Sequence, residues 1–277
     1  MLGFIKNLVG GLALISFTVV GGIANSASCP KSGGILKYGV KAEPPTYDMH
    51  GTNSYAVMHF VAQHYSTLLT FDWNKFPKLE GDVADSWNVS SDGLTYTFKI
   101  KKGIKFHDGT PLTSKDVKAT YDRLRNPPEG VISVRKALFS SISGITTPDD
   151  NTVVFKLSSP DAFMLDGFAS PFNAIYSAKD IAKDPKWHLK NINGTGPYKF
   201  VAHKKGESWK AEKFADFHHG DNCLDGTESF RIKKVAEPLI GGQIMAEWRG
   251  TAPPERVLLK KEMGDNCLLY TSDAADE

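Results

Sequence analysis

The sequence predicts a mixed α/β fold with much antiparallel sheet, and three observations support this prediction. Apolar and polar residues alternate with a period of two on both sides of a turn at 90–93, as they do in a β-hairpin. A capped helical pattern follows at 113–125. Short strand-like and helix-like segments then alternate up to about residue 235, which is typical of helices packed on sheets.

The composition is that of an ordinary globular protein. The chain has 277 residues, of which 41% are hydrophobic and 23% charged, so disordered, collagen-like and coiled-coil classes are excluded. The net charge of +2, from 33 basic and 31 acidic residues, gives no electrostatic reason to expect nucleic acid or an anionic membrane surface as a partner. Three cysteines are too few for a disulfide scaffold, and a bond between Cys29 and Cys223 is not predicted.

The two ends of the chain differ from the rest. Residues 1–28 combine the positive charge of Lys6, an apolar run at 8–20 and small residues up to Ser28, which predicts a secretory signal. The run is shorter than the roughly 20 apolar residues that span a bilayer, which argues against a membrane anchor. Lipid attachment at Cys29 is kept as an alternative. Residues 267–277 resemble a translated sequencing adapter and are not expected to belong to the fold.

The body of the chain begins with a strand and a helix. Residues 35–40 are predicted to form a strand that is buried largely on both faces, and the prolines at 44 and 45 end it. Asn53 or Ser54 can cap a helix that runs to about Leu69. One face of this helix would carry Val57, Val61, His64 and Leu68.

The segment 84–125 has the clearest pattern. Its first part predicts a hairpin at 84–100, with Trp87 in the core and with an inward face formed by Leu94, Tyr96, Phe98 and Ile100. Thr113 is a helix N-cap, and Asp116 stands at the position that completes a capping box. The apolar stripe of this helix consists of Val117, Tyr121 and Leu124.

The rest of the body continues in the same way. Downstream of the helix, we expect a strand at 153–157, a short helix at 161–169, a tight loop at 194–198, a hairpin formed by 200–203 and 208–214, and a strand at 230–235.

Three segments, in the expected order, resemble the signature of one family. They read GGILKY and EPPT within 33–46, ADSWNVSSDGLTYTFKIKKGIKFHDGTPLTSKDV at 84–117, and GTGPY at 194–198. In these segments the chain resembles the family 5 extracellular solute-binding proteins, the dipeptide, oligopeptide and nickel-binding receptors of ABC importers. It departs from the family at 213–223, where members usually have an Asn-Pro-x-Tyr-Trp-like stretch.

The resemblance implies a bilobal fold of the periplasmic-binding-protein type II kind. Family members are longer and have a further lobe that supplies the opposite wall of the binding cleft, so the chain is expected to be truncated before its C-terminal lobe. The expected division is a signal peptide at 1–28, the first part of domain I at 29–70, an inserted smaller domain at 71–187, an incomplete return to domain I at 188–266, and the adapter-like segment at 267–277.

The function implied by the resemblance is that of a periplasmic receptor. It would capture di- or oligopeptides, deliver them to ABC permease subunits in the membrane, and be a monomer when full length. No catalytic residue, cofactor or nucleic-acid partner is expected. A nickel-chelate or other small-solute receptor, an exported hydrolase and a structural envelope protein are the alternatives, although the sequence offers no nucleophile–base pair for a hydrolase.

The resemblance also places the ligand contacts. In this family the loop after the first strand and the start of the next helix line the cleft, which corresponds here to Asn53, Tyr55 and Met58. A second loop facing the cleft corresponds to Ser170 and Phe172. For Tyr55 and Met58 the alternative is simple helix packing, because apolar helix residues are mostly part of a core.

Two other groups of reactive residues are interpreted as structural. His107 and Asp108 stand in an FHDGTP turn, where aspartate and glycine serve turn geometry. Five residues with ligand-type side chains fall within 216–223, but their spacing matches no established metal motif, and no metal site is predicted. They are Asp216, His218, His219, Asp221 and Cys223.

Overall fold

The computed structural model describes residues 32–72, 74–220, 222–232, 238 and 246–247. The predictions for the signal peptide, for Cys29 and for the adapter-like segment lie outside these residues. Among the described helices, none combines the length and the apolar character that crossing a membrane requires. Cys223 is disulfide-bonded, and the other two cysteines of the chain lie outside the described residues.

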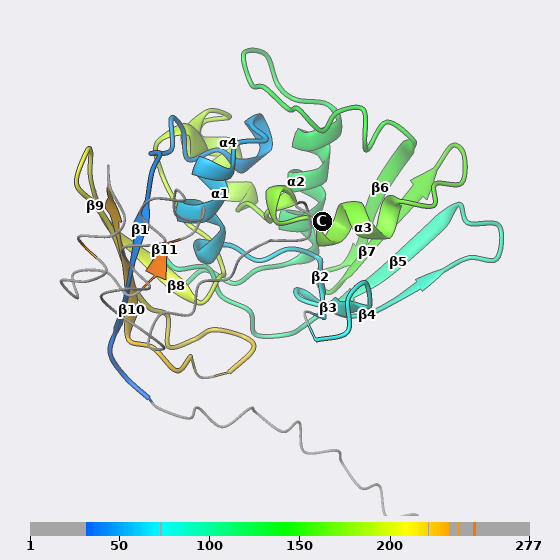
Figure 1. Ribbon diagram of the computed structural model, residues 1–277. Coiled ribbons are helices and arrows are strands. Elements are labelled where there is room, and N and C mark those ends of the chain that lie inside the picture. The colour runs from blue at the N-terminus through cyan, green and yellow to red at the C-terminus, as the bar shows by residue number, and fades with distance from the viewer. Residues whose placement is uncertain (1–31, 73, 221, 233–237, 239–245, 248–277) are drawn as a thin grey trace, which may run out of the picture.

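The described chain forms a mixed α/β structure with two main sheets, and helices lie between them in Figure 1. The first sheet has five strands in the order β11-β1-β10-β9-β8. Their bounds are β1 Ile35–Val40, β8 Tyr198–Lys204, β9 Ser208–Lys213, β10 Gly226–Arg231 and β11 Ala246–Glu247. β1 runs parallel to its neighbours β10 and β11, whereas the β10–β9 and β9–β8 pairs are antiparallel.

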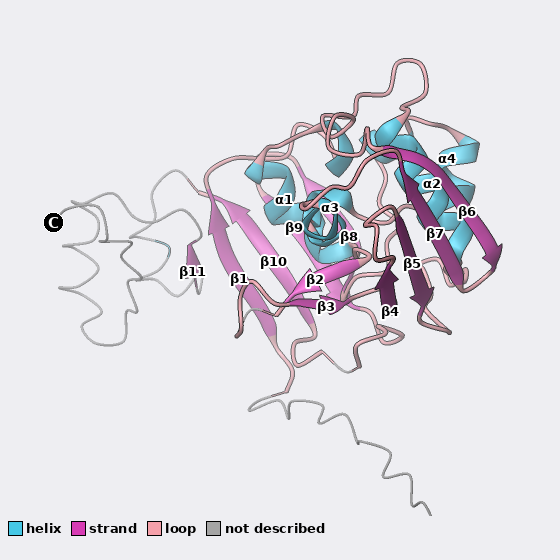
Figure 2. Ribbon diagram, turned by 90° about the vertical axis from the view of Figure 1, so that its right-hand side faces the viewer, coloured by secondary structure: helices cyan, strands magenta, loops and turns pink. Residues whose placement is uncertain are grey.

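The second sheet is antiparallel throughout and has the order β4-β5-β7-β6. Its strands are β4 Ala84–Val89, β5 Thr95–Ile100, β6 Ile142–Asp149 and β7 Thr152–Leu157. A small pair, β2 Leu69–Phe71 and β3 Leu79–Gly81, precedes it in the chain. Figure 2 shows the two main sheets side by side.

Four α-helices are described: α1 Tyr55–Val61, α2 Ser114–Arg125, α3 Met164–Ala169 and α4 Ala178–Lys183. Short 3-10 helices occur at Met49–Gly51, Ala62–His64, Pro171–Asn173 and Trp187–Leu189. The sequence predicted α2 closely, because both halves of the capping box form: Thr113 caps the first turn, and the Asp116 carboxylate accepts a hydrogen bond from the Thr113 N–H at 2.8 Å.

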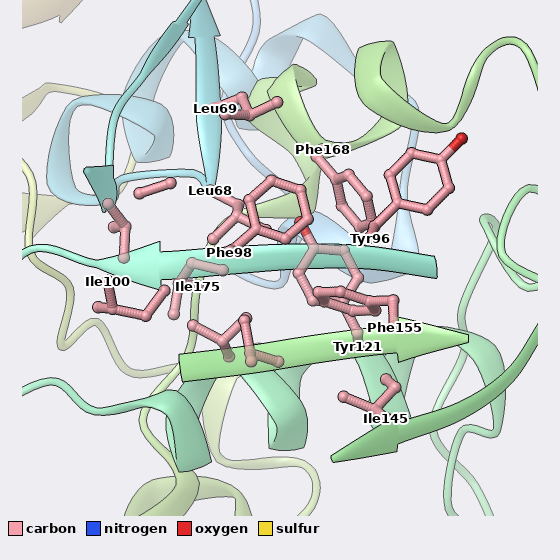
Figure 3. Packing of buried hydrophobic residues seen from close by; sticks show 14 of the residues in the cluster. Leu68, Leu69, Tyr96, Phe98, Ile100, Tyr121, Ile145, Phe155, Phe168 and Ile175 are labelled. Carbon is pink, nitrogen blue, oxygen red and sulfur yellow. The ribbon is translucent and has the colours of Figure 1, made fainter. Parts of the chain in front are cut away.

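The predicted hairpin is confirmed, and its inward face builds the core of the second sheet. Tyr96, Phe98 and Ile100 are buried, and the partly buried Trp87 packs against the same cluster. In Figure 3 the rings of Phe98, Tyr121, Phe155 and Phe168 meet between the strands and the helices. Tyr121 and Phe155 lie 5.2 Å apart with their rings perpendicular, the edge-to-face arrangement that aromatic pairs favour.

Two expectations about the first strand and first helix are wrong in part. β1 is buried only at its end, and Ile35 is 43% exposed, so the strand is not covered on both faces. α1 ends at Val61 rather than near Leu69. The reason for the early end is a glycine loop packed on the following turn: a Cβ on Gly194 would lie 1.9 Å from the His64 carbonyl oxygen, and the Gly196 N–H donates to that oxygen at 3.0 Å.

Other elements differ in extent or were not predicted. α3 begins at Met164, three residues later than expected, and β10 begins at Gly226, four residues earlier than the predicted strand at 230–235. Residues 233–235 lie outside the described part of the chain. β2, β3, β6 and α4 have no counterpart among the expected elements.

Buried apolar residues form two clusters. One lies between the second sheet, α2 and α3 and draws its members from residues 68–175. The other lies between the first sheet and α1 and draws its members from 40–65 and 174–209. Each sheet therefore has a core of its own, and the chain passes between the two cores near residues 65–68 and again near 174–176.

Candidate functional site

The structure brings three of the five predicted ligand contacts together. Asn53 and Tyr55 stand at the start of α1, where the Ser54 hydroxyl caps the helix by accepting from Ala56 N–H at 3.2 Å. Phe172 lies in the 3-10 helix after α3. The rings of Tyr55 and Phe172 approach edge to face, with centroids 6.5 Å apart and planes at 72°.

Arg135 holds this group together, a role that no local pattern in the sequence indicates. Its guanidinium donates to the Asn53 side-chain oxygen at 2.7 Å and to the Thr52 carbonyl at 2.9 Å. The Arg135 Cζ atom also lies 4.4 Å from the centre of the Phe172 ring, a cation–π contact. Arg135 therefore fixes the loop before α1 and the aromatic ring beside it with one side chain.

Arg135 keeps its charge although it is buried. Only 8% of the residue is exposed, and burial lowers the pKa of its guanidinium to about 10, well above neutral pH. Its hydrogen-bond acceptors among the described residues are uncharged: the carbonyl oxygens of Met49 and Thr52 and the amide oxygen of Asn53. The positive charge is thus solvated by oxygen dipoles of the loop that it positions.

The surface above Arg135 is partly aromatic and apolar. Tyr55 is 53% exposed although it belongs to α1, which argues against the packing alternative for this residue. Ile132 and Val134 are exposed as well, and the Val134 N–H donates to the His50 carbonyl at 3.2 Å, which places this segment along the loop before α1. The group thus presents an exposed aromatic ring, exposed apolar side chains and a fixed amide near one another.

Met58 and Ser170 stand apart from this group. Met58 is half-buried and packs against the core of the first sheet, as the packing alternative expected. Ser170 is half-buried and extended, and its carbonyl accepts from the Asn173 N–H at 2.8 Å, which starts the 3-10 helix that carries Phe172.

A buried network supports the loop from beneath. Arg123 on α2 forms an ion pair with Asp48 at 2.6 Å, and both side chains are almost fully buried. The Tyr176 hydroxyl accepts from the Met49 N–H at 2.8 Å and donates to Asp48 Oδ1 at 3.2 Å. The backbone at 48–49 is therefore tied to α2 and to the segment before α4.

His50 completes this network as a neutral side chain. Arg123 donates to its Nδ1 at 2.9 Å, so the ring proton is on Nε2, which donates to the Ala174 carbonyl at 2.9 Å. Burial lowers the pKa of His50 to about 3. The ring stacks on Tyr176 with centroids 4.0 Å apart. The base of the candidate site thus carries no group that changes charge near neutral pH.

The turn interpretation of His107 and Asp108 agrees with the structure. Asp108 Oδ1 accepts from the Thr110 N–H at 2.9 Å, which closes a local turn. His107 Nε2 lies 3.0 Å from the Gly196 carbonyl, and burial lowers the pKa of His107 to about 4. Both residues are thus engaged in holding loops together.

A separate depression of about 870 Å³ lies near the ends of β5 and β7 and is lined mainly by charged and polar residues, among them Lys99, Lys101, Asp149 and His218. None of the five predicted ligand contacts lines it.

Comparisons with known proteins agree on one family. The model described as bacterial extracellular solute-binding proteins, family 5 Middle, matches residues 78–239. A Brucella ovis protein named as a candidate ABC transporter peptide-binding protein is 36% identical over 204 residues, which are 71% of this chain and 38% of that protein. A glutathione-binding protein GsiB from Pectobacterium atrosepticum is 37% identical over 147 residues, which are 53% of this chain and 28% of that protein.

A solved structure gives the same result for the fold. The periplasmic binding protein DppA from Helicobacter pylori, in complex with the peptide STSA, superposes with a TM-score of 0.76 at 27% identity. The match covers 83% of this chain and 49% of DppA. The chain thus spans half or less of the length of these proteins.

Proposed function

Because the chain belongs to the family 5 bacterial extracellular solute-binding proteins, we propose that it is part of the substrate-binding receptor of an ABC importer. The receptor captures di- or oligopeptides outside the cytoplasmic membrane and delivers them to permease subunits. The family match over residues 78–239 carries this proposal. The peptide-binding names of the Brucella ovis relative and of DppA support peptides as the solute.

In the proposed mechanism, the receptor binds its solute and does not change it chemically. A ligand that contacts two lobes favours the closed arrangement, because it binds the closed form more tightly than the open one. The permease then recognises the closed form. The described chain contributes one wall, and the surface around Tyr55, Phe172 and Asn53 is the part of that wall proposed to face the solute.

Each residue of this surface has a distinct proposed role. The amide oxygen of Asn53 is occupied by Arg135 at 2.7 Å, which leaves the Nδ2 hydrogens to donate to a ligand carbonyl. Tyr55 and Phe172 offer ring faces and edges to apolar side chains of varied size. Ser170 stands apart from this surface but precedes the 3-10 helix that carries Phe172, and its proposed role is to offer a hydroxyl to the ligand. Arg135 is a positioning residue, because it acts through Asn53 and Phe172.

A second candidate solute is glutathione. The 37% identity to a glutathione-binding protein favours it, although that match covers only 53% of this chain. Glutathione is itself a short peptide-like molecule with free carboxylates, so the same donors and aromatic surfaces could bind it. A panel that contains dipeptides, tetrapeptides, nonapeptides and glutathione separates the two candidates by calorimetric titration of a full-length version of the protein.

Replacing Tyr55 tests the proposed surface. In a full-length version, Tyr55→Ala should weaken peptide binding about tenfold, because loss of an aromatic anchor that packs on the ligand costs about 1–2 kcal/mol of binding energy. The melting temperature should change little, since Tyr55 is 53% exposed and contributes little to the core. Calorimetric titration and thermal unfolding measure the two effects.

Phe76→Ala is the matched control, because Phe76 is also an exposed aromatic residue, at 69%, and lies between β2 and β3, away from the candidate site. It should leave binding within about twofold of the wild type. Equal losses of binding and stability in Tyr55→Ala would show that Tyr55 is a packing residue and would remove it from the site.

A further inference from the structure

A cluster of three potential metal ligands joins two distant segments of the chain. His218 and His219 lie in the loop between β9 and β10, and Asp82 directly follows β3. The Nε2 atoms of the two histidines lie 2.9 Å and 2.8 Å from the same oxygen, Asp82 Oδ1. The three ligand atoms all lie within 4.8 Å of one another. Side chains 136 residues apart thus converge on one point.

The loop that carries the histidines is held in shape by its own contacts. The Phe217 ring packs against both imidazoles, with centroids at 4.9 and 5.4 Å. Gly220 closes the turn through a hydrogen bond to the Phe217 carbonyl at 3.1 Å, with a φ of +98° that favours glycine. The two imidazoles therefore need little movement to act as ligands. Each Nε2 that now donates to Asp82 must give up its proton when it binds a metal, and the proton then resides on Nδ1 of the same ring.

Asp82 is fixed just as firmly. Its Oδ2 atom accepts from the Thr67 N–H at 2.7 Å, and its own N–H donates to the Leu68 carbonyl at 3.3 Å. One carboxylate oxygen is thus held by the backbone while the other faces the imidazoles. Only 13% of the Asp82 side chain and 5% of the His218 side chain are exposed. A ligating carboxylate held by a further hydrogen bond is typical of metal sites.

The protonation states suit ligation. Burial lowers the pKa of His218, although the hydrogen bond that His218 donates to Asp82 opposes this, so the imidazole is neutral at neutral pH. Burial raises the pKa of Asp82, but the hydrogen bonds from His218 and His219 outweigh it and lower the pKa to about 2. One carboxylate and the neutral imidazole of His218 are therefore available, and His219 Nε2 lies 2.8 Å from the same carboxylate oxygen. Two lysines near the cluster are engaged: Lys105 with Asp216 at 3.0 Å and Lys101 with the Gly81 carbonyl at 3.0 Å.

We propose that Asp82, His218 and His219 form a binding site for a divalent transition-metal ion, with Zn²⁺ as the probe of choice. Two imidazole nitrogens and one carboxylate oxygen are a donor set that this class of ion prefers. Tetrahedral Zn²⁺ with bonds of about 2.0–2.2 Å places its ligand atoms about 3.3 Å apart, so the imidazoles need to withdraw from Asp82 by roughly 0.5 Å. Water would complete the coordination.

The site has an access route and a structural consequence. His218 lines the depression near the ends of β5 and β7, and the His219 side chain is 38% exposed, so an ion can enter from solvent. A bound ion would clamp the β9–β10 loop onto the chain between β3 and β4. Binding to the folded state alone stabilises that state by mass action.

The proposed ligand set differs from the group that the sequence places together. Asp216 pairs with Lys105, and Cys223 is disulfide-bonded, so neither is available as an anionic ligand. Asp221 lies outside the described residues. The third ligand is Asp82, which no local spacing could indicate. The earlier prediction of no metal site rested on spacing within 216–223 alone.

Titration of the full chain with Zn²⁺, without an affinity tag, tests this proposal. The wild type should bind one ion in the micromolar range or tighter and gain melting temperature with Zn²⁺. His219→Gln and Asp82→Asn should each weaken binding about tenfold or more. Asp216→Asn, a carboxylate of the same loop, should bind within about twofold of the wild type. Co²⁺ should give the visible absorption of a tetrahedral site in the wild type and in Asp216→Asn.

Two results would overturn the proposal. One is the absence of Zn²⁺ binding to the wild type up to about 100 μM, a concentration far above the dissociation constants of protein zinc sites. The cluster would then be a hydrogen-bonded contact only. The other is wild-type affinity in both His219→Gln and Asp82→Asn, which would place any bound ion elsewhere. His219→Gln guards against a folding artefact, because His219 is the most exposed of the three residues.

Discussion

The buried His64 is kept neutral by its burial and by the positions of its two hydrogen-bond partners. His64 is fully buried, and its Nδ1 donates to the Tyr198 carbonyl at 2.7 Å. Its Nε2 accepts from the indole N–H of Trp209 at 3.0 Å. A second proton, on Nε2, would face the indole N–H of Trp209, so protonation is unfavourable. Burial also lowers the pKa of His64 to about 3. His64 therefore acts as a fixed link between the turn after α1 and the first sheet.

Because of this link, we expect the free energy of unfolding to decrease as the pH is lowered. The pKa of His64 is about 3 in the folded protein, against about 6.5 when unfolded, so between these values the unfolded state binds more protons. The stabilising contribution is complete above pH 6.5 and is lost as the pH falls toward 3. From pH 7 to pH 5, the free energy of unfolding should drop by about 2 kcal/mol for His64. Urea unfolding at a series of pH values measures this drop.

His64→Gln provides the comparison for that prediction. Glutamine can offer a donor and an acceptor without titrating, so the variant should be less stable at pH 7 but lose less stability toward pH 5. The buried His50, whose pKa is also about 3, should maintain part of the slope in both proteins. An equally steep loss in His64→Gln would mean that His64 does not contribute to the pH dependence.

At the scale of elements, the glycine loop at 194–198 decides where α1 ends. Gly196 lies against the backbone of the turn after α1, and a Cβ there would lie 2.5 Å from the Tyr65 nitrogen. The Ser66 hydroxyl also donates to the Thr195 carbonyl at 3.3 Å. The chain leaves the helix at this place because the loop needs the space and the hydrogen bonds that another helical turn would occupy.

A Cβ atom at position 196 should therefore lower the stability of the folded protein. Gly196→Ala should destabilise the protein by about 1–3 kcal/mol or more, because the clash is with backbone that cannot move aside. Gly144→Ala in β6 is the matched control, since nothing lies within 4 Å of a Cβ there, and it should be neutral or slightly stabilising. Chemical denaturation compares the two, and equal stability of both variants would contradict the close-packing explanation.

Local signals explain which elements the sequence could predict. The hairpin at β4–β5 and the capped helix α2 follow from alternation and from Thr113 with Asp116, all within a few residues. The end of α1 depends on glycines about 130 residues later in the chain, which no local pattern reveals. β6 was not predicted because two register shifts interrupt the alternation of its apolar and polar residues.

The same distinction applies to the candidate site. The family resemblance indicated the neighbourhood of Tyr55 and Phe172, and their contact at 6.5 Å places them together. Arg135 carries no recognisable signal, because its partners are distant in sequence. Asn53 and Thr52 are 82 and 83 residues away, and Phe172 meets Arg135 only through folding. Asp82 was missed as a partner of His218 for the same reason.

At the scale of the whole molecule, a buried ion pair links the two cores. Arg123 belongs to α2, which packs on the second sheet, whereas Asp48 lies between β1 and α1, next to Met49 in the core of the first sheet. Their side chains are 1% and 2% exposed, and the guanidinium also donates to His50 Nδ1 at 2.9 Å and to the Pro185 carbonyl at 3.2 Å. Removing the cation would leave Asp48 as a buried charge with no cationic partner.

Arg123→Met should therefore destabilise the protein by about 3 kcal/mol or more. Arg125→Met is the control on the same helix: Arg125 pairs with Asp122 at a partly exposed position, and its loss should cost less than about 1 kcal/mol. Equilibrium unfolding followed by fluorescence measures both. Similar costs for the two variants would show that the Asp48 pair is not a main link between the cores.

The parallel pairing of β1 with β10 fixes the order in which the molecule can be assembled. Ile35 has Gly226 as its partner, so the middle of the first sheet joins the beginning of the described chain to its late part. All four strands of the second sheet are present once residue 157 has been synthesised, at which point only β1 of the first sheet exists. The second core can thus close around local contacts, while β1 stays without its neighbours until more than sixty further residues have been added.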